Sequence, residues 1–199
     1  MSSSTSLKAF SLQKISIEPK VVTMFCEEQL ILANKIVTSS VPVWHIDATG
    51  SLIKKCNSEV IYLYAIVIPV KVFGEPCLPI IEWLSSSHDT STISSILLAW
   101  WTKVRSLLVS PAVIVVDGSW TLMHSIALVF NAMPLERLLA AQWCLWRGDS
   151  RAPTVICLRL CAAHYLKSIS RRLAKMRVSN EVGGICVMKR HKIKCFSHV

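Results

Sequence analysis

A wholly apolar run at residues 112–116 restricts the folds open to this chain more than any other stretch of its sequence. A strand without polar side chains is typical of a sheet that is covered on both faces. Three more β-type runs precede it, at residues 43–48, 51–56 and 60–70. Segments with helical spacing lie at residues 25–37, 85–104, 119–131, 134–146 and 160–177, and a short strand is expected at 154–158. The pattern predicts an α/β fold.

The apolar content of the chain, 52% of its residues, raises the question of a membrane segment. The longest apolar stretches, residues 60–70 and 107–116, are too short to span a bilayer, so we interpret them as buried strands and expect no membrane association. The N-terminus lacks the basic and then apolar order of a signal peptide, so secretion is not expected. The eight cysteines are accordingly expected to be reduced.

Two aspartates, Asp47 and Asp117, stand at the ends of β-type runs and are followed by small residues. A carboxylate at the end of a buried strand is held rigidly at the edge of a sheet, where it can bind a divalent cation. Either aspartate could instead cap the turn or helix that follows it, a common role before glycine or serine.

The order of the predicted strands would bring these two aspartates together. Three antiparallel strands followed by alternating helices and strands describe a ribonuclease H-like layout, with a mixed sheet of about five strands flanked by helices. The first and fourth strands are neighbours in that layout, so Asp47 and Asp117 would meet at one end of the sheet. A bound Mg²⁺ or Mn²⁺ would relieve the repulsion between the carboxylates and activate water. The sequence therefore predicts a metal site at this pair.

Four short motifs follow one another along the chain. They are His45-Ile46-Asp47-Ala48-Thr49-Gly50, residues 74–82, Val115-Val116-Asp117-Gly118-Ser119-Trp120 with Phe130-Asn131, and Cys161-Ala162-Ala163-His164 with Tyr165-Leu166-Lys167. In this order they resemble the catalytic domain of Mutator-like (MULE) DDE transposases. The resemblance covers residues 42–175, and the ordered set is more specific than any single motif.

This resemblance implies a core that cleaves DNA and transfers strands, with two aspartates and one glutamate as ligands of two metal ions. Asp47 would bridge the metals and Asp117 would hold one of them as the second catalytic aspartate. The remaining acids after Asp117 are Glu136, Asp149 and Glu181, and none lies where the family pattern places the glutamate. We therefore expect a truncated or domesticated transposase derivative that is catalytically inactive.

Cys161 and His164 are three positions apart on a predicted helix and so point to the same side. In the family that the chain resembles, this pair marks the entry to a helical insertion. A packing or local hydrogen-bonding role is the alternative. The tail residues Cys186, His191, Cys195 and His198 depart from the usual spacing of zinc ligands, so no zinc site is predicted there.

The net charge of the chain, +10, lies entirely in its last quarter. Residues 1–150 hold eleven Lys or Arg and eleven Asp or Glu, whereas residues 151–199 hold eleven Lys or Arg and only Glu181 as an acid. Such a block favours DNA as a partner and, with the resemblance, a nuclear location. The residues expected to contact phosphates are Arg171, Arg172, Lys175, Arg177, Lys189, Arg190, Lys192 and Lys194. The alternative is a solvated tail without a partner.

We divide the sequence into a polar segment with a short helix at 1–40, the incomplete ribonuclease H-like core at 41–177, and a basic tail at 178–199. Two functions from different classes stay open for it. One is an inactive transposase-type core that retains DNA binding. The other is a non-enzymatic scaffold whose exposed tryptophan or apolar faces contact a protein partner. A homo-oligomer is compatible with both, and a third carboxylate near Asp47 and Asp117 would indicate an enzyme.

Overall fold

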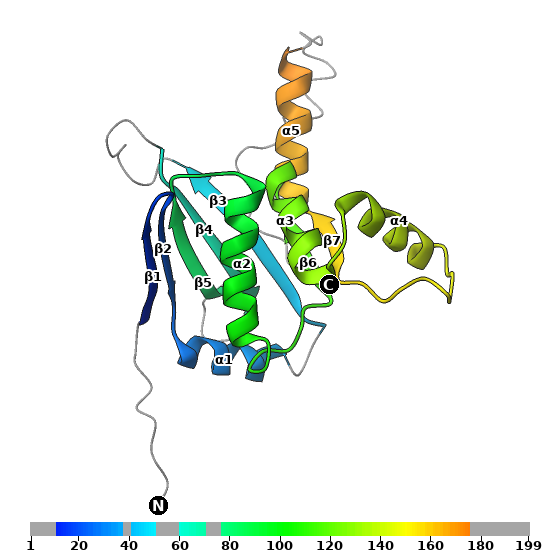
Figure 1. Cartoon of the computed structure of the whole chain (residues 1–199). Coiled ribbons are helices and arrows are strands. Elements are labelled where there is room, and N and C mark those ends of the chain that lie inside the picture. The colour runs from blue at the N-terminus through cyan, green and yellow to red at the C-terminus, as the bar shows by residue number, and fades with distance from the viewer. Residues whose placement is uncertain (1–10, 38–40, 51–59, 71–76, 176–199) are drawn as a thin grey trace, which may run out of the picture. The chain divides into compact units, whose positions relative to one another are not determined.

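The computed structural model describes residues 11–37, 41–50, 60–70 and 77–175. The chain divides into two compact units, Met1–Arg159 and Leu160–Val199. The described part of the first unit contains the strands, except for the last residue of the final strand, together with four helices (Figure 1). The described part of the second unit is chiefly one helix, and each unit is described by itself.

The first unit is organised around a seven-stranded mixed sheet. Its strands are β1 (Ser11–Ile17), β2 (Lys20–Phe25), β3 (Val43–Gly50), β4 (Tyr62–Pro69), β5 (Cys77–Ser85), β6 (Val113–Val116) and β7 (Cys157–Leu160). They lie in the order β1-β2-β5-β4-β3-β6-β7. Strand β4 pairs antiparallel with both β3 and β5, whereas β6 pairs parallel with β3. The hairpin β1–β2 extends the sheet beyond β5.

The predicted α/β class is confirmed, but the predicted count of about five strands is wrong. The hairpin β1–β2 lies in the stretch that the sequence indicated to be polar. Polar and apolar residues alternate irregularly in β1, and its side chains Leu12, Ile15 and Ile17 are exposed. Because strand preference mostly reflects packing on a half-buried surface, an edge strand with so little burial has only a weak sequence signal.

The three consecutive antiparallel strands also differ from those predicted. The run at 60–70 corresponds to β4, and the third strand is β5, which the sequence did not predict; the predicted strand at 51–56 lies outside the described residues. Pro79 interrupts the apolar pattern of β5, and the β4–β5 register shifts between Ile66 and Val67, where Val67 pairs with Pro79. Proline cannot donate to the ladder, so it occurs at irregularities of this kind and obscures the strand in the sequence.

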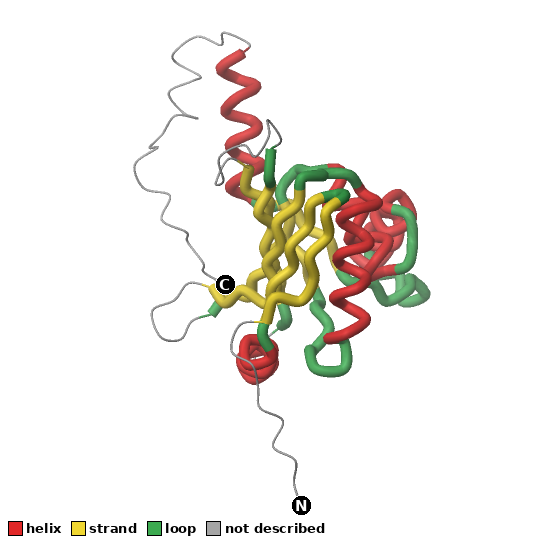
Figure 2. Tube along the Cα trace, turned by 60° about the vertical axis from the view of Figure 1, so that its left-hand side comes forward, coloured by secondary structure: helices red, strands yellow, loops and turns green. Residues whose placement is uncertain are grey.

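The described residues form five helices, α1 (Glu27–Val37), α2 (Thr90–Val104), α3 (Trp120–Asn131), α4 (Leu135–Trp146) and α5 (Ala162–Lys175), close to the predicted segments. Helices α2 and α3 lie on the same face of the sheet (Figure 2). Helix α3 begins after its N-cap Ser119 and ends at Ala132, which has a left-handed φ of 50°. No helix in the described part of the chain is long and apolar enough to cross a membrane.

Aromatic side chains fill the core between the sheet and helices α2 and α3. Trp44 of β3 is fully buried, and its ring meets those of Trp100, Trp101 and Phe130 edge-on at centroid distances of 5.8, 5.7 and 6.0 Å. Because side chains alternate along a strand, this packing directs Ile46 to the helices as well. It leaves Asp47 on the opposite face of the sheet.

A second apolar cluster, formed by Ala127, Leu135 and Leu138, joins α3 to α4. Asn131 at the end of α3 accepts a hydrogen bond from the Ile156 N–H at 2.8 Å and donates one to the Ile156 carbonyl at 3.3 Å. This pair of bonds holds the segment that leads into β7 beside α3.

Asp89 caps the N-terminus of α2. Its carboxylate accepts hydrogen bonds from the Ser87 hydroxyl, from the Thr92 N–H at 2.8 Å and from the Thr92 hydroxyl at 2.7 Å. These bonds, that from Ser87 first, lower the pKa of Asp89 to about 2. The contribution of the charged cap to stability is therefore present above the unfolded pKa of 3.8 and is lost as the pH falls towards 2.

We expect Asp89→Ala to lower the free energy of unfolding by about 1 kcal/mol at pH 7, because the first turn of α2 loses its acceptor. Asp89→Asn keeps a capping oxygen and should lower it by much less. Urea unfolding of both variants at pH 7 measures the difference. Equal losses in the two variants would show that the side chain does not stabilise the helix as a cap.

Candidate metal site on strands β3 and β6

Asp47 and Asp117 occupy corresponding positions on neighbouring parallel strands. Ile46 pairs with Val116 in the β3–β6 register, and each aspartate is the next residue along the chain. Adjacent strands lie about 4.8 Å apart, so the two residues lie side by side. Asp117 directly follows β6, but β3 continues past Asp47 to Gly50, so the prediction that Asp47 stands at the end of its strand is wrong. From this arrangement we expect their carboxylates to lie roughly 4 to 8 Å apart, which allows one or two divalent ions to be shared.

Asp47 is exposed, and its Oδ1 accepts a hydrogen bond from the Ala48 N–H at 2.8 Å. His45, two residues earlier, lies on the same face of β3. Burial lowers the pKa of His45, so its imidazole is neutral at pH 7. A neutral imidazole on this face adds no positive charge that would oppose a cation at Asp47.

Asp117 is half-buried in the turn between β6 and α3. Its Oδ1 accepts a hydrogen bond from the Ser119 N–H at 2.9 Å, which is the pattern of a turn capped by an aspartate. The capping role that the sequence offered as an alternative for Asp117 is therefore present. This bond fixes the orientation of the carboxylate, and a carboxylate has further lone pairs for a metal.

The described residues do not supply a third ligand to this pair. In that part of the chain, no three His, Cys, Asp or Glu side chains are grouped so that they could hold a metal ion. Glu136 lies in the first turn of α4, and Asp149 pairs with Arg151 at 3.6 Å just beyond that helix. Glu181 lies outside the described residues.

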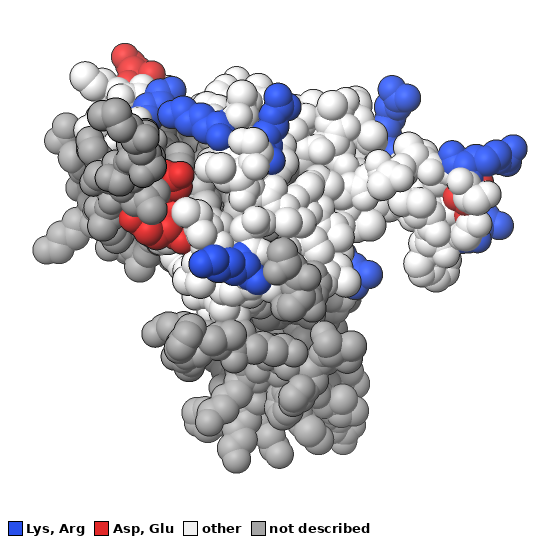
Figure 3. Space-filling view, turned by 90° about the horizontal axis from the view of Figure 1, so that it is seen from below, with Lys and Arg blue, Asp and Glu red and all other residues white. Residues whose placement is uncertain are grey.

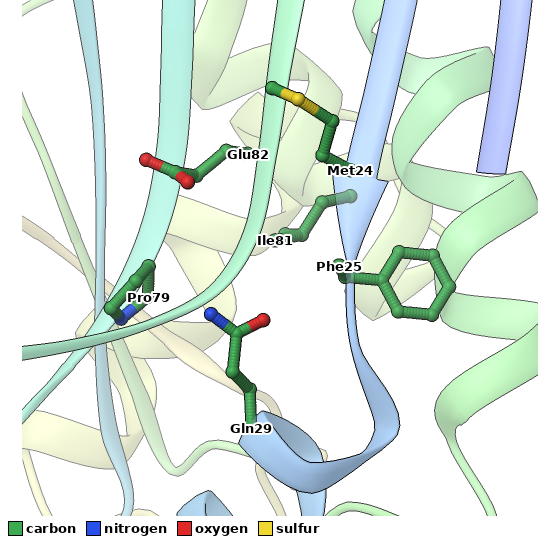
Figure 4. A pocket seen from close by; sticks show the side chains of 6 residues that line it. All are labelled: Met24, Phe25, Gln29, Pro79, Ile81 and Glu82. Carbon is green, nitrogen blue, oxygen red and sulfur yellow. The ribbon is translucent and has the colours of Figure 1, made fainter. Parts of the chain in front are cut away.

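Glu82 of β5 lies on the same face of the sheet as Asp47 but two strands away. It pairs with Ala65 of β4, which in turn pairs with Asp47. Glu82 also lines a cavity of about 10 Å³ together with Met24, Phe25, Gln29, Pro79 and Ile81 (Figure 4). That volume corresponds to about one water molecule, so the cavity does not accommodate an organic ligand.

A chain of hydrogen-bonded side chains, the Tyr64–His88–Ser119 chain, lies beside Asp117. Tyr64 Oη is 2.6 Å from His88 Nδ1, and His88 Nε2 is 3.3 Å from Ser119 Oγ. In either neutral tautomer the imidazole links the phenol to the serine hydroxyl. The sequence pattern did not predict this chain.

Tyr64 is the buried end of the chain. Its side chain is fully buried, and its ring stacks on that of Trp83 at a centroid distance of 4.9 Å. Burial raises the pKa of Tyr64, and the charges of Tyr62, Asp89 and Asp117 raise it further, so the phenol keeps its proton.

Only part of this arrangement is indicated by the sequence. Ser119 begins one of the predicted helical segments, and His88 lies within another, at residues 85–104. Nothing in their spacing relates them to Tyr64, which is far away in the sequence. The contact forms because the turns before α2 and α3 lie side by side, as the 3.2 Å hydrogen bond from Ser125 Oγ to the Thr90 carbonyl also shows.

The pair Cys161 and His164 belongs to the second unit. Cys161 directly precedes α5, and its carbonyl accepts the Tyr165 N–H at 3.0 Å. His164 lies in the first turn of that helix, and both side chains are half-buried. His164 Nδ1 is buried without a hydrogen-bond partner among the described residues. The predicted same-side placement is untested, and no described residues join the pair in a metal-binding group.

Helix α5 contains four Lys or Arg residues and no acid. Arg171 and Arg172 are exposed on it, and Lys175 is its last residue. The other residues predicted to contact phosphates lie outside the described part: Arg177, Lys189, Arg190, Lys192 and Lys194. Figure 3 shows the described Lys and Arg side chains that are visible on one face of the molecule.

No protein-family model, curated protein or solved structure matches this chain. Strand order and side-chain placement alone define its class. It is an α/β protein with a seven-stranded mixed sheet and with two aspartates on adjacent parallel strands, Asp47 within β3 and Asp117 directly after β6.

Proposed function

We propose that the chain is a ribonuclease H-like core derived from a MULE-type DDE transposase, with Asp47 and Asp117 as ligands of a divalent cation. The strand order supports this proposal. Apart from the β1–β2 hairpin, the order is β5-β4-β3-β6-β7, in which three antiparallel strands are followed by a parallel neighbour of the first. The observation that carries the proposal is the Ile46–Val116 register, which makes the two aspartates neighbours.

The chemistry of the two aspartates suits Mg²⁺ or Mn²⁺, which prefer oxygen ligands. Such an ion, when bound, stabilises the charge of a phosphodiester and provides activated water. The Ala48 and Ser119 N–H groups each hold one oxygen of an aspartate in place. With two of the three acidic ligands of the DDE pattern, the chain is not expected to cleave DNA.

DNA is the proposed partner, and the nucleus the proposed location. Exposed arginines on α5, which has no acid to neutralise them, support phosphate binding by the second unit. Sequence-independent contacts of this kind need no catalytic site. An inactive core could therefore still associate with DNA.

A non-enzymatic scaffold is the second candidate function, and α4 favours it. Trp143 and Trp146 of α4 are 57% and 77% exposed, and their rings stack at a centroid distance of 5.0 Å. Leu139, one turn before Trp143, is 47% exposed. Exposed aromatic and aliphatic side chains on one helix are typical of a surface that contacts another protein.

The metal proposal predicts that the purified chain binds Mn²⁺ and that each aspartate contributes to the affinity. Asp47→Asn and Asp117→Asn should each weaken binding by at least about tenfold, since even the loss of an outer partner of a metal ligand has that effect. Water-proton relaxation during a Mn²⁺ titration measures the affinity. Glu136→Gln, which removes the same charge from an exposed position on α4, is the matched control and should bind as the wild type does.

Wild-type Mn²⁺ affinity in both aspartate variants would overturn the metal site.

The same proteins should show no cleavage of supercoiled DNA above background in Mg²⁺ or Mn²⁺. Nicking that disappears in Asp117→Asn would mean that the chain does possess a third ligand, and Glu181 would be the first residue to test.

A further inference from the structure

We propose that His88 is a positioning residue for Asp117 and acts through Ser119. The inference rests on the proposed metal site, because it concerns how one of its ligands is oriented. It assigns a role to a histidine that neither the metal site nor the DNA-binding residues include.

The imidazole of His88 is held by β4. Its Nδ1 lies 2.6 Å from Tyr64 Oη, and its ring lies 5.9 Å from the Tyr64 ring in a stacked arrangement. The Tyr62 ring also contacts the His88 ring, at a centroid distance of 5.2 Å. Because Tyr64 is fully buried and stacked on Trp83, the phenol is a rigid anchor for the imidazole.

The Nε2 atom of His88 contacts Ser119, the residue whose N–H is hydrogen-bonded to Asp117. Ser119 Oγ is 3.3 Å from His88 Nε2 and also accepts the Leu122 N–H at 3.4 Å as the N-cap of α3. The N–H of the same serine donates to Asp117 Oδ1 at 2.9 Å. Fixing the Ser119 side chain therefore fixes the donor that orients the carboxylate.

Tyr64, the buried end of the Tyr64–His88–Ser119 chain, also lies beside β3, the strand that carries Asp47. Tyr64 pairs with Ala48 across β3 and β4, and the Ala48 N–H donates to Asp47 Oδ1. The Tyr64–His88–Ser119 chain thus connects the turn that carries Asp117 to β4, the strand next to the one that carries Asp47. In metal sites, partners outside the ligand shell set the orientation of the ligands in this way.

The test compares three substitutions of His88 in the full chain by Mn²⁺ titration. His88→Ala removes both hydrogen-bonding positions of the ring and should weaken Mn²⁺ binding about tenfold. His88→Gln places an amide near the former Nε2 and should restore most of the affinity through Ser119. The shorter amide of His88→Asn can reach Tyr64 Oη but not Ser119 Oγ, so this variant should bind Mn²⁺ as weakly as His88→Ala. Tyr62→Phe, which keeps the ring against His88, is the control for packing.

A second measurement, amide hydrogen exchange at Ser119 without metal, reports the bond to Asp117 directly. Exchange should be faster in His88→Ala than in the wild type and should slow again in His88→Gln. Unchanged exchange, or Mn²⁺ affinity that is unchanged in His88→Ala, would overturn the positioning role. Absence of Mn²⁺ binding by the wild type would instead overturn the proposed function, and the exchange rates would then decide the role of His88 alone.

Discussion

Trp44→Ala is expected to lower the free energy of unfolding by about 4 kcal/mol, a large part of the stability of a domain of this size. The substitution removes a fully buried indole that contacts three other aromatic rings. It leaves a cavity between β3 and the helices that the surrounding rings cannot fill without losing their own contacts. Urea unfolding followed by far-ultraviolet circular dichroism measures the change without depending on tryptophan fluorescence.

Trp120→Ala is the matched control for this prediction. Trp120 is 68% exposed at the start of α3, so the same truncation there should change the free energy of unfolding by no more than about 0.5 kcal/mol. Similar losses in the two variants would contradict the position of Trp44 at the centre of the core.

DNA affinity is expected to be independent of sequence and to fall steeply with salt concentration. Each phosphate that a Lys or Arg neutralises contributes about 0.9 to the slope of log affinity against log salt on duplex DNA. Deleting residues 183–199 removes Lys189, Arg190, Lys192 and Lys194 and should make the slope shallower by as much as about 3 to 4. Fluorescence anisotropy with a labelled duplex at a series of salt concentrations measures it.

The contribution of helix α5 to DNA binding can be separated from that of the tail. Arg171→Ala with Arg172→Ala should reduce the slope by about 2, since both side chains are exposed on a helix without acids. Arg137→Ala with Arg147→Ala removes the same charge from α4 and is the control. If the tail deletion and the α5 variant both bind DNA like the wild type at every salt concentration, residues 151–199 are only a solvated basic segment.

Local patterns predicted much of the secondary structure. The helices α3 and α4 were predicted within a few residues and α2 within five, because their apolar side chains recur at helical spacing. Strand β6 was predicted because a short apolar run rich in valine and isoleucine is typical of a buried strand, although Val113 and Val115 are only half-buried. The edge hairpin β1–β2 and the proline-containing strand β5 lacked such a pattern and were missed.

The candidate site was predictable in part. The association of Asp47 and Asp117 with β-type runs is visible in the sequence, and the predicted layout of strands makes them neighbours. The pairing of the preceding residues, Ile46 and Val116, agrees with that layout. The surroundings of Asp117 were not predictable. His88 contacts both Tyr64 and Ser119 only because the turns before α2 and α3 and strand β4 come together in the folded protein. The spacing of residues along the sequence does not indicate such a contact.

The sequence by itself therefore determined the α/β class, most helices, the association of the two aspartates with β-type runs, and the concentration of positive charge in the last quarter. These properties depend on side chains within one or two turns of each other, or on composition alone. Only the tertiary structure decided which strand pairs with β4, how the N-terminal hairpin extends the sheet, and which side chains surround Asp117. Strand pairing and register depend on contacts between distant segments and on which face is buried, and short stretches of sequence do not specify either.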